Sequence, residues 1–179
     1  MNSAPRTLLH YAIFIALTVL LCDLQSSLWI QFFGFSPAPL LWVLVLVYWV
    51  LYRRFIESLI MLYIITYILS LFTTAHFGLL CFNLHCILFI IYFIKGRLYL
   101  EGPLYFMAIT ATACFIFPPL HSLNNVLLTK LPWIYPDVFS WIMNILLTML
   151  ASLPTYQLFV WVDSKVRSTH KKALEKDYL

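Results

Sequence analysis

The chain alternates between long stretches without charged residues and short segments that carry them. Five uncharged stretches hold 16, 29, 37, 28 and 25 residues. They lie between Arg6 and Asp23, Asp23 and Arg53, Glu57 and Lys95, Glu101 and Lys130, and Asp137 and Asp163. A helix that spans a membrane needs about 20 mostly apolar residues, because each residue adds ~1.5 Å toward a hydrocarbon core of ~30 Å. The pattern therefore predicts membrane-spanning helices.

Helix-breaking residues divide the two longest stretches. The breakers are Gly34, Pro37 and Pro39 in the second stretch and residues 73–78 in the third. Closely spaced prolines and glycines cannot continue a helix. We therefore expect one six-helix transmembrane domain over residues 1–162 and a basic cytoplasmic tail over residues 163–179. The expected spans are 8–29, 40–52, 55–72, 79–94, 103–117 and 138–162, of which the second, fourth and fifth are short for a bilayer.

Composition narrows the class of protein. The chain is 63% hydrophobic, 18% aromatic and only 10% charged, with a mean hydropathy of +0.92. Soluble domains average about 45–50% apolar and ~25% charged residues, so a soluble domain is excluded. Disordered chains are poor in aromatic residues and rich in charge, so disorder is excluded as well. The expected fold class is an all-α polytopic membrane protein.

The basic residues fall on one side of the predicted spans. With a cytoplasmic N-terminus, ten lysines and arginines face the cytoplasm and only Lys130 lies outside. The ten are Arg6, Arg53, Arg54, Lys95, Arg97, Lys165, Arg167, Lys171, Lys172 and Lys176. Because lysine and arginine near span ends set topology, we expect both termini in the cytoplasm. The net charge of +4 forms no continuous basic face, so a nucleic-acid partner is not expected.

Motifs for catalysis or metal binding do not occur in the sequence. It holds no GxSxG, HExxH or P-loop motif and no paired-carboxylate constellation. Cys81 and His85 are four residues apart, which suits two ligands of one metal, but no further ligand follows at helical spacing. Neither Cys22, Cys81, Cys86 nor Cys114 belongs to a CxxC pair, which disfavours a membrane redox enzyme. We expect no catalytic residue, no cofactor and no metal.

Small and polar residues within the spans are candidates for contacts between helices. Ala12 and Ala16 form a small-xxx-small pair on the first helix, which permits close approach of another helix. Asn144 can hydrogen-bond to a neighbouring helix. Pro154 is expected to kink the last helix, because proline cannot donate to the carbonyl four residues before it.

The segment after Pro118 and Pro119 allows two interpretations. Its leucines repeat at helical spacing and are Leu120, Leu123, Leu127 and Leu131. The pattern suits a short helix that lies on the outer surface, and it equally suits an irregular loop.

Two segments carry a resemblance to a known family. Residues 35–42, Phe-Ser-Pro-Ala-Pro-Leu-Leu-Trp, lead into a Leu-rich helix that ends in Tyr48-Trp49-Val-Leu-Tyr. Residues 135–139, Tyr-Pro-Asp-Val-Phe, lead to Asn144, Pro154 and a basic tail. In this order the features resemble the bacterial rod shape-determining protein MreD family, over most of the chain.

The resemblance implies a function without catalysis. A member of this family would be an inner-membrane scaffold of the cell-elongation machinery that builds peptidoglycan in rod-shaped bacteria. Its partner would be a single-span MreC-like protein, and it would act alongside the actin-like filament, the glycan polymerase and the transpeptidase. Helix docking would occur on the Ala12 and Ala16 face and at Tyr48 and Trp49.

An alternative function belongs to proteins of similar fold. MreD-family proteins are similar to the six-helix substrate-binding subunits of energy-coupling-factor vitamin transporters. Such a subunit needs a polar cavity near its outer side. The residues that could furnish one are His76, Asn83, His85, His121, Asn124 and Asn125.

Overall fold

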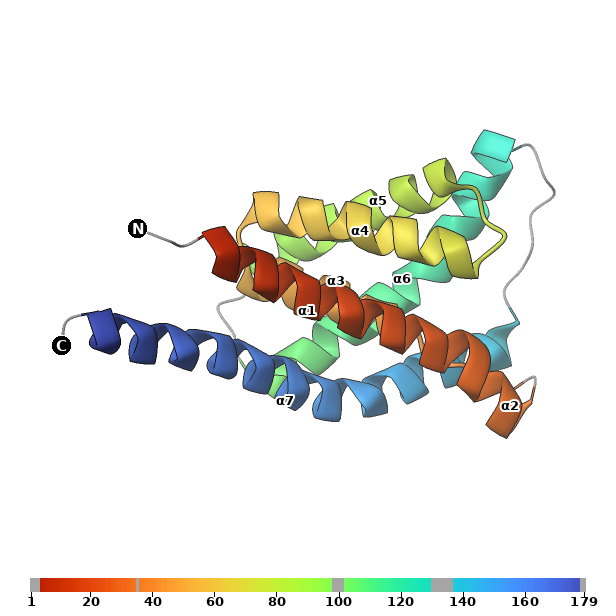
Figure 1. Ribbon diagram of the computed structural model, residues 1–179. Coiled ribbons are helices and arrows are strands. Elements are labelled where there is room, and N and C mark those ends of the chain that lie inside the picture. The colour runs from red at the N-terminus through yellow and green to blue at the C-terminus, as the bar shows by residue number, and fades with distance from the viewer. Residues whose placement is uncertain (1–3, 35, 98–101, 130–136, 178–179) are drawn as a thin grey trace.

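The computed structural model describes residues 4–34, 36–97, 102–129 and 137–177, and all regular structure in these ranges is helical (Figure 1). The helices are α1 (Ala4–Asp23), the π-helical turn η1 (Leu24–Leu28), α2 (Trp29–Phe33), α3 (Leu41–Tyr52), α4 (Phe55–Phe72), α5 (Phe77–Lys95), α6 (Pro103–Thr129) and α7 (Val138–Asp177). The expectation of an all-helical protein is confirmed for these residues.

Within the described ranges, five helices are long and apolar enough to cross a membrane. They comprise Leu9–Phe33, Phe55–Phe72, Phe77–Lys95, Pro103–Leu127 and Val138–Lys165. The sixth apolar helix, α3, has 12 residues and is thus only about 18 Å long. The protein is therefore a multi-pass membrane protein by helix length and hydropathy.

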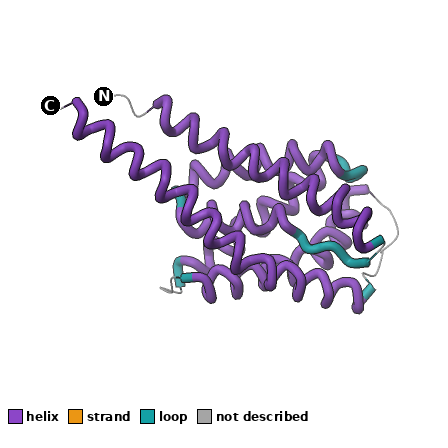
Figure 2. Tube along the Cα trace, turned by 60° about the horizontal axis from the view of Figure 1, so that its bottom comes forward, coloured by secondary structure: helices purple, strands orange, loops and turns teal. Residues whose placement is uncertain are grey.

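The direction of the chain alternates along α1, α3, α4, α5, α6 and α7, so α1 and α4 run the same way, and both chain ends lie at the same end of the bundle (Figures 1 and 2). At the far end, α1, η1 and α2 form one continuous rod that stops at Gly34. The Gly34 amide donates to the Ile30 carbonyl at 2.9 Å, and its φ of 63° is a conformation that glycine adopts without a steric penalty.

α3 occupies the centre of the bundle. It contacts α1, α4, α5, α6 and α7, and every residue from Leu41 to Leu51 is buried. A helix that is apolar on all sides has no solvent- or lipid-facing stripe, which explains why its sequence lacks helical periodicity. Burial on every side also explains how so short a helix persists in this fold.

Side chains from four other elements bind the two ends of α3. At its N-terminal end, the Leu40 amide donates to Thr148 Oγ1 at 2.8 Å and the Leu41 amide donates to Gln25 Oε1 at 3.0 Å. At its C-terminal end, the Val50 carbonyl accepts from Lys95 Nζ at 2.9 Å. The Trp49 carbonyl likewise accepts from the Ser58 hydroxyl at 2.9 Å. Backbone groups that water would satisfy at an exposed helix end are thus satisfied within the bundle.

α6 continues through Pro118 and Pro119 to Thr129 as one helix. The prediction of a separate surface helix or loop after these prolines is therefore wrong. Pro118 cannot donate to the Cys114 carbonyl, and the Trp141 indole N–H donates to that carbonyl instead, at 3.4 Å. A side chain of α7 thereby satisfies a backbone group that the proline leaves free.

α7 also extends further than its predicted span. It remains helical through Pro154 and on to Asp177, over most of the segment expected as a tail. Near the proline, the Thr155 hydroxyl donates to the Ala151 carbonyl at 2.7 Å, and the Ser152 hydroxyl donates to the Met149 carbonyl at 2.6 Å. These hydroxyls add hydrogen bonds where proline removes one, and the helix is not interrupted.

Candidate functional site

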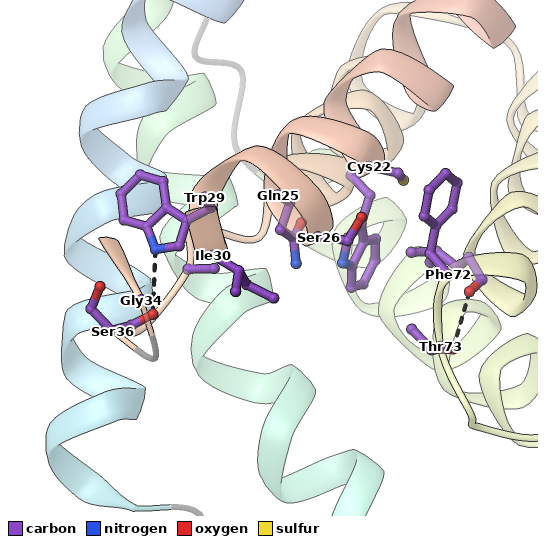
Figure 3. A pocket seen from close by; sticks show the side chains of 12 residues that line it. Cys22, Gln25, Ser26, Trp29, Ile30, Gly34, Ser36, Phe72 and Thr73 are labelled. Atoms are coloured by element: carbon purple, nitrogen blue, oxygen red, sulfur yellow. Dashed lines mark hydrogen bonds between the residues drawn. The ribbon is translucent and has the colours of Figure 1, made fainter. Parts of the chain in front are cut away.

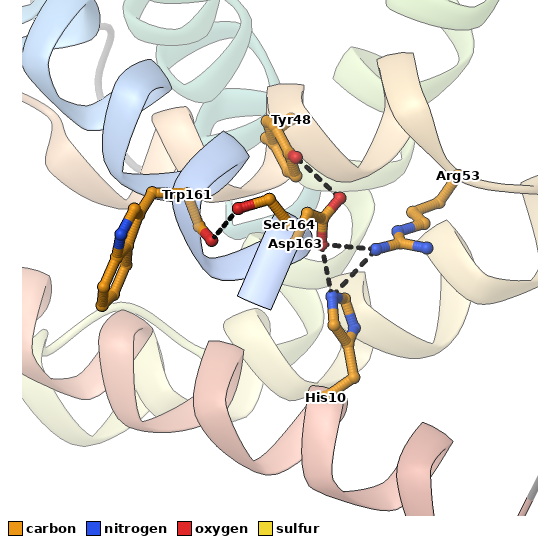
Figure 4. Close-up of polar contacts among 6 residues, drawn as sticks. All are labelled: His10, Tyr48, Arg53, Trp161, Asp163 and Ser164. Carbon is orange, nitrogen blue, oxygen red and sulfur yellow. Dashed lines mark hydrogen bonds and ion pairs between the residues drawn. The ribbon is translucent and has the colours of Figure 1, made fainter. Parts of the chain in front are cut away.

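A cluster of ionisable and polar side chains joins three helices around Asp163. Its Oδ1 atom lies 2.6 Å from His10 Nε2 of α1 and 2.6 Å from Arg53 Nη2, just after α3. Its Oδ2 atom accepts from the Tyr48 hydroxyl of α3 at 2.8 Å. Figure 4 shows the three side chains converging on the carboxylate of α7. We refer to His10, Tyr48, Arg53 and Asp163 as the Asp163 cluster.

His10, Arg53 and Asp163 form a three-way contact. Arg53 Nη2 is 2.8 Å from His10 Nε2, and both nitrogens approach the same carboxylate oxygen. A guanidinium only donates, so Arg53 donates to Asp163, and His10 Nε2 either accepts from Arg53 or donates to Asp163 according to its tautomer. The carboxylate accepts from Arg53 and Tyr48 with either tautomer.

Aromatic rings surround the cluster. The Arg53 guanidinium lies 5.6 Å from the centre of the Trp49 ring, within range of a cation–π interaction. The His10 ring lies 4.8 Å from Phe14 and 5.6 Å from Trp49, measured between ring centroids. The side chains of His10, Arg53 and Asp163 are 10, 19 and 14% exposed. This partial burial strengthens the attraction between the opposite charges relative to a surface pair.

An open pocket of about 300 Å³ adjoins the carboxylate and is lined by Tyr48, Tyr52, Val160, Asp163 and Ser164. The Ser164 hydroxyl turns away from Asp163 and donates to the Trp161 carbonyl at 2.7 Å (Figure 4). Because Arg53 and His10 already engage Asp163, the carboxylate is not a free anionic ligand. The arrangement is suited to holding helices together.

Sequence reasoning did not find the Asp163 cluster. By sequence, Asp163 begins the expected tail, Arg53 is only a topology signal, and His10 has no predicted role. The available signal was an acidic residue that follows the apolar run Leu158–Val162 without a break, together with a histidine inside the first span. Ionisable residues within apolar helices pair with one another, so each of them calls for a partner.

The Ala12 and Ala16 side chains lie on the exposed face of α1. Leu9, Val19 and Leu20 extend the same face, with 55, 41 and 62% exposure. We call these five residues the α1 stripe. Their positions recur every three or four residues, so they follow one side of the helix.

Tyr48 and Trp49 do not form an exposed docking surface. They are only 2 and 1% exposed, and they pack against Phe14 at centroid distances of 5.7 and 5.4 Å. Neighbouring helices of the same chain already cover both rings, so the predicted docking of a partner helix at Tyr48-Trp49 would require these helices to move apart. The reason is the central position of α3.

A second polar cluster joins α5 to α6. Asn83 Nδ2 lies 2.9 Å from His121 Nδ1, and Asn124 Nδ2 donates to Asn83 Oδ1 at 2.5 Å. His85 instead bonds within its own helix, with Nδ1 2.8 Å from the Cys81 carbonyl. Three of the six residues considered for a vitamin cavity are thus brought together, but they hydrogen-bond to one another and line neither of the two pockets described here.

The Asn144 amide does not make the predicted contact through its oxygen. Its Oδ1 atom is buried and has no hydrogen-bond partner among the described residues. The Asn144 backbone carbonyl accepts from the Thr148 hydroxyl at 2.6 Å, and Thr148 in turn accepts from the Leu40 amide. Asn144 therefore supports the N-terminal end of α3 through its backbone.

A second pocket, of about 320 Å³, lies at the end of the bundle away from the chain termini (Figures 1 and 3). The last turn of α1, η1, α2, the segment that follows them, the start of α3 and the end of α4 line it. We call it the η1 pocket. Its lining includes Ser26, Trp29 and Trp42 and no charged side chain.

Metal binding finds no support in the described part of the chain, where no group of three or more His, Cys, Asp or Glu side chains is placed to hold an ion. The four cysteines are free thiols, with Cys22 and Cys114 buried and Cys81 and Cys86 partly exposed. Cys81 Sγ lies 3.6 Å from His85 Nδ1, which pairs the two residues without a third ligand.

These features define the class of the protein as an all-helical, multi-pass membrane protein whose buried polar residues connect its helices. No protein-family model, curated protein or solved structure matches the chain.

Proposed function

We propose that the protein is a non-enzymatic scaffold that holds the transmembrane helix of a single-span partner on the α1 stripe. The observation that supports this proposal is the outward orientation of Ala12 and Ala16. Lipid provides no hydrophobic drive for association between helices, so close packing over small residues has to provide the attraction. The two alanines between Leu9 and Leu20 have small side chains, so a partner backbone can approach α1 closely there.

The Asp163 cluster sets which side of α1 faces outward. His10 points inward to Asp163 and is only 8% exposed, whereas its neighbour Leu9 is 55% exposed. Rotation of α1 about its axis would withdraw His10 from the carboxylate. The cluster therefore keeps the α1 stripe in a fixed orientation, which is what a docking surface requires.

The resemblance to the MreD family supplies the identity of the partner in this proposal. The partner is an MreC-like protein, and the setting is the inner membrane and the peptidoglycan-synthesising elongation machinery of a bacterium. The proposal includes six crossings, with α3 as the short second one, and cytoplasmic termini. Its support is that both chain ends lie at one end of the bundle and that basic residues favour the cytoplasmic side.

Co-purification tests the proposal. The tagged protein and an MreC-like single-span protein are co-expressed, solubilised in mild detergent and isolated through the tag. We expect a complex with the unaltered chain and at least a tenfold loss of recovered partner when Ala12→Leu and Ala16→Leu are combined, because bulky side chains prevent close approach.

Ala108→Leu serves as the matched control. Ala108 is exposed on α6, so this variant makes the same chemical change on a different helix. It should leave recovery of the partner unchanged. Equal recovery with the α1 variant, or no complex between two well-folded proteins, would exclude docking on the α1 stripe.

The vitamin-binding alternative receives less support from the side-chain arrangement. Asn83, His121 and Asn124 hydrogen-bond to one another and line neither the η1 pocket nor the pocket beside Asp163. A thermal-stability screen tests it directly, because a vitamin at 100 times its dissociation constant would add about 2.7 kcal/mol to the free energy of unfolding. We expect no such stabilisation.

A further inference from the structure

The η1 pocket is built on an irregular turn of the first long helix. Residues Leu24–Leu28 form a π-helical turn between α1 and α2, and two of them, Gln25 and Ser26, line the pocket (Figure 3). A π-turn inserts an extra residue into a helix and is frequent at functional sites. The lining residues of this rod, Cys22, Gln25, Ser26, Trp29 and Ile30, recur every three or four positions, so they lie along one side of it.

Most polar groups of the pocket already have partners. Gln25 Oε1 accepts from the Leu41 amide, and the Trp29 indole donates to the Ser36 carbonyl at 3.3 Å. The Thr73 hydroxyl donates to the Leu69 carbonyl at 3.0 Å. The Ser26 hydroxyl differs, because its oxygen is buried and has no hydrogen-bond partner among the described residues. A buried hydroxyl without a partner is costly, so this group is poised for a ligand.

The lining restricts the chemistry of that ligand. No charged residue lines the pocket, so an ion would lose its hydration without compensation. Leu69, Phe72, Trp42 and Ile30 supply apolar and aromatic surface. A cavity of about 320 Å³ with such walls and few polar groups lies within the range of small-molecule sites.

The surroundings of the pocket indicate the source of the ligand. Phe32 and Phe33 of α2 are 77 and 59% exposed, and Leu71 at the end of α4 is 68% exposed. In a multi-pass membrane protein, apolar residues this exposed are in contact with lipid. A lipid molecule can therefore reach the pocket mouth directly.

We propose that the η1 pocket binds an uncharged lipid-like molecule, an apolar chain that carries a hydroxyl or an ester carbonyl, with Ser26 as its hydrogen-bond partner. Bound there, the ligand contacts Trp29 and Trp42 and joins the end of α1 to the end of α4. This site is separate from the α1 stripe, so the proposal does not depend on the docking function.

Fluorescence quenching in detergent tests this proposal. The probe is a monoacylglycerol with a dibrominated chain, because bromine quenches tryptophan emission at short range. We expect saturable quenching that unbrominated monoacylglycerol reverses by competition, a measurement that needs no variant. Trp29→Phe should lose part of the saturable amplitude, since Trp29 lines the pocket.

Two adjacent serines provide a matched pair of variants. Ser26→Ala should weaken binding about fivefold, the equivalent of one hydrogen bond of ~1 kcal/mol. Ser27→Ala should leave binding unchanged, because the exposed Ser27 hydroxyl donates to Asp23 at 2.8 Å and does not line the pocket. Ala38→Phe should abolish the saturable component by filling the cavity.

Probes of different chemistry distinguish the ligand class. A brominated alkane has no group that can hydrogen-bond to Ser26. It should therefore bind the unaltered protein about as weakly as the monoacylglycerol binds the Ser26→Ala variant. A brominated fatty acid in its carboxylate form should show no saturable quenching. The proposal is overturned if quenching is linear and insensitive to competitor, if the carboxylate binds as tightly as the uncharged probe, or if Ser26→Ala and Ser27→Ala behave alike.

Discussion

Asp163 Oδ1 lies 2.6 Å from His10 Nε2, so the last helix of the chain closes onto the first across 153 positions of sequence. Tyr48 and Arg53 bring the central helix to the same carboxylate. One acidic side chain thereby connects α1, α3 and α7. α1 and α7 share few other contacts, so this connection is central to their relative placement.

Removing the charge of Asp163 should destabilise the fold. Asp163→Asn leaves Arg53 without its counter-charge in a partly buried site, and we expect a loss of about 2–3 kcal/mol in the free energy of unfolding. Arg53→Met should have a similar effect. The double variant should lose less than the sum of the two, and unfolding in mixed micelles measures this coupling. Strict additivity would show that the pair does not interact.

The contacts of His10 Nε2 predict different results for two substitutions. The side-chain amide of His10→Gln can occupy the position of Nε2 and hydrogen-bond to Asp163 or to Arg53, whereas His10→Leu can do neither. We expect His10→Gln to retain more stability than His10→Leu, by about 1 kcal/mol. Thermal unfolding in detergent compares them. Equal stability of the two variants would contradict a contribution from the Nε2 contacts.

The second polar cluster, in which Asn83 hydrogen-bonds to His121 and Asn124 between α5 and α6, should also contribute to stability. Asn83 is fully buried, and Asn83→Ala removes its bonds to both His121 and Asn124. We expect a loss of about 1–3 kcal/mol, because the partners remain buried. Thr112→Ala is the control, since the Thr112 hydroxyl donates within its own helix at 2.9 Å and is partly exposed. It should change the free energy of unfolding by much less.

Trp141 should stabilise α6 at its proline pair in two separable ways. Its ring stacks on Phe115 with centroids 4.9 Å apart, and its N–H reaches the Cys114 carbonyl. Trp141→Phe retains an aromatic ring and removes the donor, so we expect a loss of about 0.5–1.5 kcal/mol. Trp141→Ala should cost more. If Trp141→Phe is neutral in thermal unfolding, the indole hydrogen bond does not contribute.

Asp137 forms the N-terminal cap of α7, outside the apolar span. Hydrogen bonds from the Ser140 hydroxyl at 2.6 Å and the Ser140 amide at 3.1 Å lower the pKa of the Asp137 carboxyl. Because the folded-state pKa is depressed, the cap stabilises the fold above the unfolded-state pKa and loses this effect as the pH falls through the folded value. Ser140→Ala should raise the Asp137 pKa toward its ordinary range, as measured by carboxyl NMR titration.

The apolar pattern predicted the helices well because lipid imposes a length and a hydropathy on each crossing. The prediction that the helix ends at Pro118 and Pro119 was wrong. The Cys114 carbonyl, to which Pro118 has no N–H to donate, accepts from the indole of Trp141, which lies 23 positions after Pro118. Propensity rules treat a proline pair as a stop because they consider only the local backbone. The residue that satisfies the freed carbonyl comes from another helix and carries no local signal.

The polar sites were harder to predict than the helices. His10, Arg53 and Asp163 lie in three separate apolar segments, and nothing in their spacing indicates that they meet. Docking at Tyr48 and Trp49 is predicted only through the family resemblance, which carries no information on how deeply the two rings are buried. Their burial depends on α3 being central, which is a property of the whole bundle. Ala12 and Ala16, by contrast, could be placed on one face from helical spacing alone.

The hydrogen bond between the Leu40 amide and Thr148 has a consequence for the order in which the helices complete their folding during synthesis. Helix α3 is too short to span a bilayer unaided, and its first free amide is bonded by Thr148, almost one hundred residues downstream of the helix end. During synthesis, α3 therefore cannot complete its hydrogen bonding until α7 has left the ribosome. Truncation before residue 148 should leave the Leu40 amide without its partner, whereas the Leu41 amide keeps Gln25, so an unfinished chain holds α3 by only part of its N-terminal hydrogen bonds.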